Sequence, residues 1–170
     1  MSRPTATTAT AADWPEVAAL RHRVFVVEQG VPAELERDDA DATAVHALSR
    51  DAAGRVVATG QLLLEAAGPG RAVIGRMAAD PAVRGRGHGG AVLGVLQREA
   101  AARGQTEVEL HARVTARRFY ERAGYRVVGE QYQEAGIAHV TMRRALPEGD
   151  AGALWGSGPD RGTRSVRPFG

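Results

Sequence analysis

The chain has 170 residues, a length that suits one domain with its own hydrophobic core. It contains no cysteine, which excludes disulfide bonds, thiolate metal ligands and a cysteine nucleophile. The formal net charge is only +2, and the basic residues are all arginines spread along the chain, so charge gives little support to nucleic-acid binding. No apolar run approaches the ~20 residues of a membrane span and no signal peptide is evident, so we expect a soluble, cytoplasmic protein.

The first half of the chain predicts one helix among four strands. Residues 5–10 (TATTAT) favour a strand through their threonine content, with a disordered leader as the alternative. Asp13 is the expected N-cap of a helix over 13–27. The apolar face of this helix is formed by Val17, Leu20, Val24 and Val27. An acidic segment follows over 34–41. Three strands are then expected, over 44–50, 55–65 and 71–79, and the short turns between them favour antiparallel hairpins.

The second half of the chain predicts two helices and three strands, followed by a tail. The expected elements are a helix over 87–103, a strand over 106–110, a helix over 115–123, and strands over 125–133 and 136–144. Past Leu146, nine of the last 24 residues are glycine or proline, a share typical of disordered sequence. We therefore expect a domain over 1–146 and a disordered tail over 147–170 that catalysis does not need.

A glycine-rich turn stands between the strand over 71–79 and the helix over 87–103. After Asp80-Pro81 it consists of Arg84, Gly85, Arg86, Gly87, His88, Gly89 and Gly90. The first backbone N–H groups of a helix lack internal partners and carry partial positive charge, so such a turn binds anions. Glycine lets a phosphate approach the backbone, and the two arginines add donors suited to phosphate oxygens. We therefore expect a phosphorylated cofactor, with a solvated basic turn as the alternative.

Two cofactor classes compete for this turn. The dinucleotide-binding fingerprint G-x-G-x-x-G is matched by Gly85, Gly87 and Gly90. Glu107 lies roughly the expected ~20 residues further on. In that class, however, the loop follows its strand at once and opens a repeated βαβ unit, whereas here Asp80–Gly85 intervenes and too little chain remains for two such halves. The spacing R-x-x-G-x-G, which begins at Arg84, fits the sequence better.

With its preceding strand and Asp80-Pro81 turn, the R-x-x-G-x-G motif resembles the acetyl-CoA loop of the GCN5-related N-acetyltransferases (GNAT). The order of the expected elements over 5–146 also resembles that family. The stretches RHRVFVVEQGVPAELERDDAD, FYERAGY and EAGIAHVTM are similar to the ElaA-type subgroup of bacterial acetyltransferases. The resemblance implies an α/β (α+β) fold with a mixed, mostly antiparallel central sheet of about seven strands, helices on both faces and splayed strands at the acetyl-CoA site. It also implies transfer of an acetyl group from acetyl-CoA to an amine by direct attack.

The resemblance also implies which residues contact the cofactor. The pantetheine arm is expected to pair with the backbone of Met77, Ala78 and Ala79, and the pyrophosphate to rest on the amides from Arg84 to Gly90. Many relatives have an asparagine near the start of the helix that corresponds to 115–123 here, where it contacts the cofactor. This chain has Thr115 there, and its hydroxyl could cap the helix instead.

The chemistry calls for an acid and a base. Tyr120 matches the family tyrosine that points at the thioester sulfur and is the expected acid, with packing on the apolar helix face as its alternative role. An alkylamine with a pKa of ~10.4 is less than about 0.1% neutral at pH 7, so a base must remove its proton. The candidate bases are Glu28, Glu34, Glu36, His46, His111, Glu134 and His139. His111 and His139 have the most suitable locations, and no paired histidine spacing indicates a metal site.

The sequence leaves the acceptor open among a small-molecule amine, a peptide N-terminus and a protein lysine. The acidic segment over 34–41 could attract a cationic amine, and a solvated loop explains it equally well. A non-catalytic acyl-CoA-binding sensor is the alternative function, because it would need the turn and not Tyr120. We expect no nucleic-acid or membrane partner, and a homodimer is a common state of small enzymes.

Overall fold

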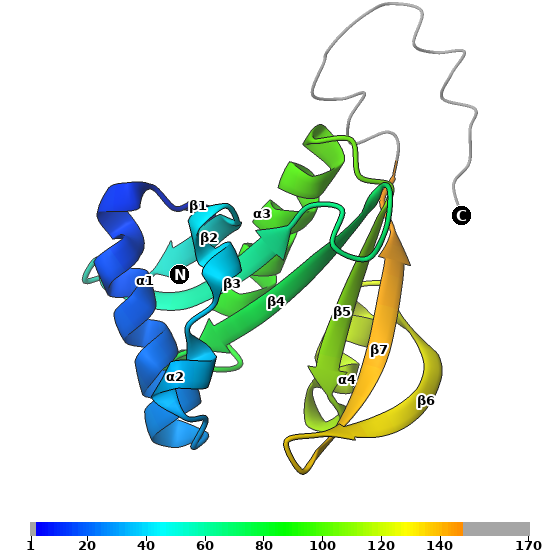
Figure 1. Ribbon diagram of the computed structural model, residues 1–170. Coiled ribbons are helices and arrows are strands. Elements are labelled where there is room, and N and C mark those ends of the chain that lie inside the picture. The colour runs from blue at the N-terminus through cyan, green and yellow to red at the C-terminus, as the bar shows by residue number, and fades with distance from the viewer. Residues whose placement is uncertain (1–2, 148–170) are drawn as a thin grey trace, which may run out of the picture. The chain divides into compact units, whose positions relative to one another are not determined.

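The computed structural model describes residues 3–147 (Figure 1). Its strands are β1 (Ala6–Thr8), β2 (Val45–Arg50), β3 (Val56–Leu63), β4 (Arg71–Ala79), β5 (Glu107–Arg113), β6 (Arg126–Glu134) and β7 (Ile137–Ala145). Its α-helices are α1 (Trp14–Arg21), α2 (Ala33–Glu36), α3 (His88–Ala102) and α4 (Arg117–Arg122). The other helical segments are η1 (Ala11–Asp13), η2 (His22–Glu28), η3 (Asp39–Ala42), η4 (Pro81–Val83) and η5 (Val114–Ala116). All the predicted strands and helices are present, and the predicted tail beyond Pro147 lies outside the described residues.

The strands form a seven-stranded sheet in the order β1-β2-β3-β4-β5-β7-β6. β2 pairs antiparallel with β1 and with β3, so the turn after β2 makes the predicted hairpin. β4 and β5 pair in parallel through Arg71–Val73 and Glu107–Glu109. β7 pairs antiparallel with both β5 and β6. The mixed, mostly antiparallel sheet with its helices confirms the predicted fold class.

The chain divides into two compact units. The first comprises the described residues up to Leu63 together with Ile74–Leu96, and the second comprises Leu64–Val73 together with the described residues from Gln97 onward. β4 and α3 therefore each contribute residues to both units. Within residues 3–147, no helix combines the length and the apolar character needed to cross a bilayer.

The first helical segment packs its apolar face against the sheet of the first unit. Val17, Leu20 and Val24 are almost fully buried in one cluster with residues of β2 and β3, which confirms three of the four predicted face positions. Val27, the fourth, is wrong as a core residue because its side chain is 70% exposed. The cause is the π-helical geometry of η2, in which Gln29 N–H donates to Val24 O at 3.0 Å and the wider turn moves later side chains off the α-helical stripe.

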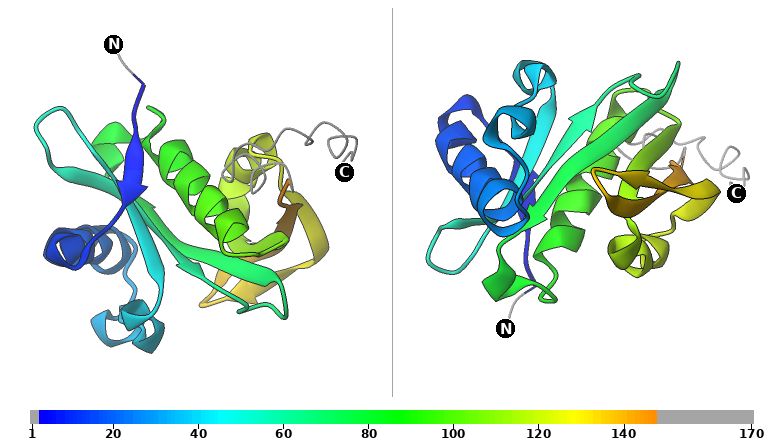
Figure 2. Two further views of the ribbon diagram at one scale, coloured as in Figure 1. Left: turned by 90° about the horizontal axis from the view of Figure 1, so that it is seen from above. Right: turned by 60° about the horizontal axis from the view of Figure 1, so that its bottom comes forward.

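Helices cover both faces of the sheet in the first unit, with α1 on one face and α3 on the other (Figure 2). Gly60 of β3 allows α3 to approach closely. A methyl group at Gly60 would lie 2.5 Å from Met77 Sδ, 2.9 Å from Leu96 Cδ1 and 3.0 Å from Val92 Cγ1. The strand therefore needs glycine at this position, where α3 crosses it.

In the second unit, β5 and β7 alternate buried and accessible residues, as strands of a half-covered sheet do. The buried positions are Val108, Leu110, Ala112, Val140 and Met142. Leu110 is directly opposite Met142 in the strand register, so these side chains share one face. α4 lies behind β5 and β7 in Figure 1. The opposite face carries charged and imidazole side chains.

Candidate functional site

The glycine-rich turn joins η4 to α3 within the first unit. Asp80 begins the segment, because its carboxylate accepts a hydrogen bond from Ala82 N–H at 3.0 Å. Gly85 has φ +83° and Gly87 has φ +98°, both in the left-handed region that favours glycine. Ala91 N–H donates to Gly87 O at 3.0 Å, which closes the first turn of the 15-residue helix α3. The turn thus delivers the chain to a helix N-terminus.

This N-terminus has the properties of an anion site. The amides of His88, Gly89 and Gly90 precede Ala91 and have no acceptor four residues back inside α3. The helix dipole adds partial positive charge at the same end. A methyl group at Gly90 would meet nothing within 4 Å, so the backbone there is open to a ligand. The arrangement fits a phosphate or diphosphate group.

The two arginines of the turn differ in their surroundings. Arg84 donates from Nη1 and Nη2 to the two carboxylate oxygens of Glu28, both at 2.7 Å, and from Nε to Ala79 O at 2.9 Å. The hydrogen bonds to Glu28 raise the pKa of Arg84 above its usual value. Arg86 is exposed, and its side chain makes no hydrogen bond or ion pair to another residue within 3–147. Arg86 is therefore the arginine whose guanidinium is available to a phosphate.

The side chain of His88 anchors the start of α3 to the sheet. Its Nδ1 lies 2.7 Å from Ser49 Oγ on β2. The Ser49 hydroxyl donates its one hydrogen to Thr5 O at 2.7 Å, so His88 must donate from Nδ1–H. His88 thus offers its backbone amide to the anion site while its ring holds the helix in place. No sequence motif marks Ser49, because 39 residues separate it from His88.

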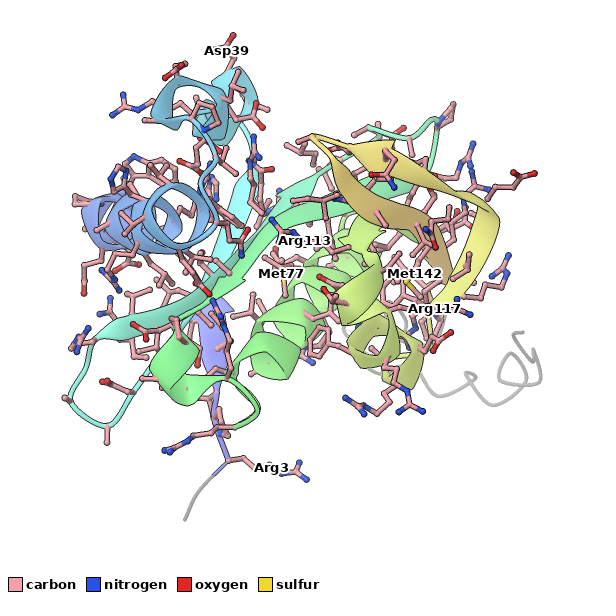
Figure 3. All side chains as sticks on the ribbon, turned by 90° about the horizontal axis from the view of Figure 1, so that it is seen from below. Arg3, Asp39, Met77, Arg113, Arg117 and Met142 are labelled. Atoms are coloured by element: carbon pink, nitrogen blue, oxygen red, sulfur yellow. The ribbon has the colours of Figure 1, made fainter. Side chains whose placement is uncertain are left out.

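The three residues expected to contact pantetheine end β4. Ala78 is 6% exposed and belongs to the core cluster under α1. Met77 points the other way, and Figure 3 shows its side chain reaching from β4 toward α3. Ala79 is the last residue of the strand, and its carbonyl accepts the hydrogen bond from Arg84 Nε. The structure therefore brings Met77–Ala79 and the turn together in the first unit.

The remaining predicted site residues belong to the second unit. Tyr120 of α4 is 8% exposed, and its ring contacts Phe119 and Tyr125 edge to face, with centroids 4.9 Å and 5.9 Å away. Burial raises the pKa of Tyr120 to about 12. No hydrogen bond joins the Tyr120 hydroxyl to another residue within 3–147. Tyr125 differs in this respect, because its hydroxyl donates to Gln97 Oε1 at 2.8 Å.

Both candidate histidines lie on the polar face of β5 and β7. His139 is directly opposite Arg113, and His111 is directly opposite Thr141 in the register. Residues two apart on a strand share a face, so His111 and His139 are diagonal neighbours on one face. This polar face is one surface of the sheet. The helix α4, which carries Tyr120, lies behind the other surface (Figure 1).

His111 is exposed and held by a carboxylate. Its Nε2 lies 2.8 Å from Glu109 Oε2, and the other oxygen of Glu109 accepts from Arg143 Nε at 3.0 Å. Burial alone would raise the pKa of Glu109, but the hydrogen bonds from His111 and Arg143 outweigh it and lower that pKa. Nε2–H is then the donor, and Nδ1 keeps its lone pair.

His139 is half-buried and held by the backbone. Its Nδ1 lies 2.8 Å from Ile137 O, and a carbonyl can only accept, so Nδ1 carries the hydrogen. Nε2 is then the nitrogen with a lone pair. The ring stacks on Tyr132 of β6, with centroids 5.8 Å apart and an interplanar angle of 26°. This tautomer and orientation suit a proton acceptor.

The other sequence-predicted candidates have different roles. Thr115 is exposed in η5, and α4 has Ala116 as its N-cap with no side-chain hydrogen bond, so the alternative role of Thr115 as a cap is wrong. His46 donates from Nε2 to Asp41 O at 3.0 Å, and its Nδ1 is buried without a partner among the described residues. Glu34 and Glu134 are exposed. Among residues 3–147, no group of three or more histidine or carboxylate side chains could hold a metal ion.

Much of the charge in the acidic segment is neutralised inside the first unit. Arg21 is 2% exposed and donates from Nε to Glu36 Oε2 at 2.6 Å and from Nη1 to Asp41 Oδ1 at 2.9 Å. Gln61 Nε2 also donates to Asp41 Oδ1, at 2.7 Å. Asp38 lies 3.7 Å from Arg76. The sequence did not single out Arg21, which lies on the helix 15 and 20 residues before its two carboxylates.

The chain is similar to known acetyltransferases over most of its length. The family model for the acetyltransferase (GNAT) domain matches residues 9–146. The uncharacterized N-acetyltransferase YjcF of Bacillus subtilis is 32% identical over 126 residues, which cover 74% of this chain and 87% of YjcF.

Two solved structures share the fold and part of the sequence. Escherichia coli ElaA matches with a TM-score of 0.72 and 26% identity, covering 83% of this chain and 99% of ElaA. An acyl-CoA N-acyltransferase from Pseudomonas aeruginosa matches with a TM-score of 0.70 and 33% identity, covering 84% of this chain and 99% of that protein. The match to ElaA agrees with the resemblance seen in the sequence.

Proposed function

This chain belongs to the GNAT family and is an acyltransferase, and we propose that it transfers the acetyl group of acetyl-CoA to the nitrogen of an amine acceptor. The observation that carries the proposal is the glycine-rich turn at the N-terminus of α3. The amides of His88, Gly89 and Gly90 and the guanidinium of Arg86 form a donor set suited to the diphosphate of CoA. The backbone of Met77–Ala79 would hold the pantetheine arm, and the bound cofactor supplies an activated acyl thioester.

Tyr120 is the proposed acid. Its pKa of about 12 keeps the hydroxyl protonated throughout the neutral range. A free thiol has a pKa of ~8.5, so full proton transfer from Tyr120 to the departing sulfur is uphill by roughly three to four pKa units. The hydroxyl therefore stabilises the developing thiolate chiefly by donating a hydrogen bond, and the thiolate takes its proton from solvent. The absence of a described intramolecular partner for this hydroxyl supports the role.

His139 is the proposed base. Removing the proton of an amine with a pKa of ~10.4 at pH 7 costs about 4–5 kcal/mol, which a positioned acceptor offsets in part. The Nδ1–H bond from His139 to Ile137 O leaves Nε2 as the acceptor nitrogen. His111 is the second candidate base, because its Nδ1 also keeps a lone pair, although its ring is exposed. Glu28 and Glu36 are less suited, because each is bound to an arginine.

The acceptor is a small-molecule or peptide amine. Because Arg21 neutralises Glu36 and Asp41, the exposed Glu34 and Asp39 are the residues of the acidic segment best placed to attract a cationic amine. A homodimer remains a prediction that sedimentation would test.

The experiment is a continuous assay of free-thiol release from acetyl-CoA with a panel of amines: a polyamine, an amino sugar, a peptide with a free N-terminus and a peptide containing lysine. At least one amine should accelerate thiol release above the rate without amine, and mass spectrometry should find one acetyl group on its nitrogen. Tyr120→Phe should slow this release. Tight binding of acetyl-CoA, together with no release for any amine class, would favour the non-catalytic acyl-CoA sensor instead.

A further inference from the structure

The side chain of Arg84 joins three parts of the first unit. Its terminal nitrogens donate to both carboxylate oxygens of Glu28, the last residue of η2, at 2.7 Å each. Its Nε donates to the carbonyl of Ala79, the last residue of β4, at 2.9 Å. Its own backbone begins the glycine-rich turn. A single guanidinium thus links the end of η2, the end of β4 and the turn.

This geometry gives Arg84 a different task from Arg86. In a bidentate arginine–carboxylate pair, both terminal nitrogens of the guanidinium already donate to the carboxylate. A diphosphate would therefore have to displace Glu28 to bind these nitrogens. Arg86 needs no such exchange. The side chain of Arg84 therefore shapes the turn, and the amides and Arg86 are left to contact the anion.

We propose that Glu28 is a positioning residue for acyl-CoA binding, which acts through Arg84 by holding the glycine-rich turn in its binding shape. The inference rests on the proposed function of the turn. Gly85 and Gly87 have φ values of +83° and +98°, and glycine is also the residue with the most conformational freedom to lose. A turn with such residues binds more weakly when it must be ordered at the moment of binding.

Glu28 is presented from a fixed backbone. Gln29 N–H donates to Val24 O at 3.0 Å and Gly30 N–H donates to Val26 O at 3.1 Å, so the chain is held on both sides of Glu28. Phe25, one turn earlier, packs against the core cluster under α1. The carboxylate therefore has a rigid base from which to hold Arg84.

The positioning role and simple electrostatics predict opposite signs for Glu28→Gln. Glu28 is a negative charge beside an anion site, so its removal should strengthen diphosphate binding if charge alone mattered. If Glu28 positions the turn, the same change should weaken binding. We expect the dissociation constant of CoA to rise about tenfold, the loss that follows when one charge-assisted hydrogen bond is weakened.

The test is calorimetric titration of the full chain with CoA and with acetyl-pantetheine, which lacks the diphosphate. Glu28→Gln, Arg84→Met and the double variant form a cycle. Because Glu28 acts through Arg84, the double variant should bind CoA no more weakly than Arg84→Met alone. Acetyl-pantetheine binding should change much less. In turnover, KM for acetyl-CoA should rise while kcat at saturation stays within about twofold.

Glu16→Gln is the matched control, because it weakens another exposed carboxylate–arginine pair of the first unit, Glu16 Oε1 to Arg50 Nη1 at 3.2 Å, which includes no residue of the turn. Unchanged or tighter CoA binding by Glu28→Gln, or losses that multiply in the double variant, would overturn the inference. If wild type binds no CoA, the proposed function fails first and this inference with it. If Glu28→Gln does not fold, Arg84→Lys keeps the charge without the fork and should show the same loss of CoA affinity.

Discussion

Tyr120 and Tyr125 lie edge to face in the second unit, with ring centroids 5.9 Å apart and an interplanar angle of 74°. Both are buried, yet only the Tyr125 hydroxyl has a hydrogen-bond partner within residues 3–147, Gln97 Oε1. Substitution of either tyrosine by phenylalanine removes only the hydroxyl and keeps the buried ring. Comparison of the two variants therefore distinguishes a chemical role of the hydroxyl from packing of the ring.

Tyr120→Phe should lower kcat by roughly 10²-fold, the lower end of the range for acid–base groups. The affinity for acetyl-CoA should stay unchanged, because the proposed role of the lost hydroxyl is to stabilise the departing sulfur. Steady-state thiol release and calorimetry measure the two quantities. Tyr125→Phe, which loses only the bond to Gln97, should keep kcat within a few fold. Full turnover by Tyr120→Phe would contradict the assignment.

The raised tyrosine pKa values predict a loss of stability at alkaline pH. Burial raises the pKa of Tyr120 to about 12 and also raises that of Tyr125, against ~10 in an unfolded chain. The contribution of Tyr120 is fully present below pH ~10 and is lost as pH rises to about 12, a change of about 3 kcal/mol. Between pH 9 and pH 11.5, the free energy of unfolding measured by urea denaturation should fall less in Tyr120→Phe than in wild type. Equal falls in the two proteins would contradict the contribution of Tyr120 ionisation to the alkaline loss of stability.

His139→Gln should lower turnover most at neutral pH. As pH approaches the pKa of the amine acceptor, more of the acceptor is already neutral, so the need for a base falls. The ratio of wild-type to variant kcat/KM should therefore be about tenfold or more at pH 7 and should shrink by pH 9.5. His111→Gln is the comparison variant. A larger loss in His111→Gln than in His139→Gln would move the base to His111.

Gly60→Ala should destabilise the fold by about 1–3 kcal/mol, because the added methyl group would overlap Met77 Sδ and crowd Leu96 and Val92. The unfolding free energy from urea titration measures the effect. Gly75→Ala on β4 is the control, since a methyl group there would meet nothing within 4 Å. A cost at Gly60 no larger than at Gly75 would show that α3 does not pack so closely on β3.

Arg21→Met should cost about 3–5 kcal/mol of unfolding free energy, because the change leaves Glu36 and Asp41 without their buried cation. Asp39→Asn, at an exposed position of the same segment, should change stability by less than about 0.5 kcal/mol. Urea titrations of both variants measure the difference. If Arg21→Met costs no more than Asp39→Asn, the network does not hold the acidic segment.

The sequence predicted most of the fold because its signals are local. Valine and leucine at helical spacing gave the α1 face, and glycine at 104 and 124 marked helix ends, both of which have left-handed φ values. The prediction was wrong at Val27, where hydrogen bonds of η2 span five residues instead of four. Such a change of helical geometry leaves no mark in hydrophobic spacing.

The candidate site was predictable only in part. The turn from Arg84 to Gly90 has a motif of its own, and its backbone geometry fits an anion. The residues that hold the turn in place belong to no such motif, because Glu28 is 56 residues from Arg84 and Ser49 is 39 residues from His88. Nor could the sequence show that Arg21 neutralises two carboxylates of the predominantly acidic segment over 34–41. These pairings depend on which segments the fold places side by side.

The proposed function depends on binding of acyl-CoA by the glycine-rich turn. Calorimetric titration of the full chain with acetyl-CoA, with free CoA and NADH under the same conditions, tests it most directly. We expect micromolar binding of both CoA species, no binding of NADH, and weaker, less salt-dependent CoA binding by Arg86→Ala. If neither CoA species binds, or if NADH binds in their place, the proposed binding of acyl-CoA by the turn is wrong.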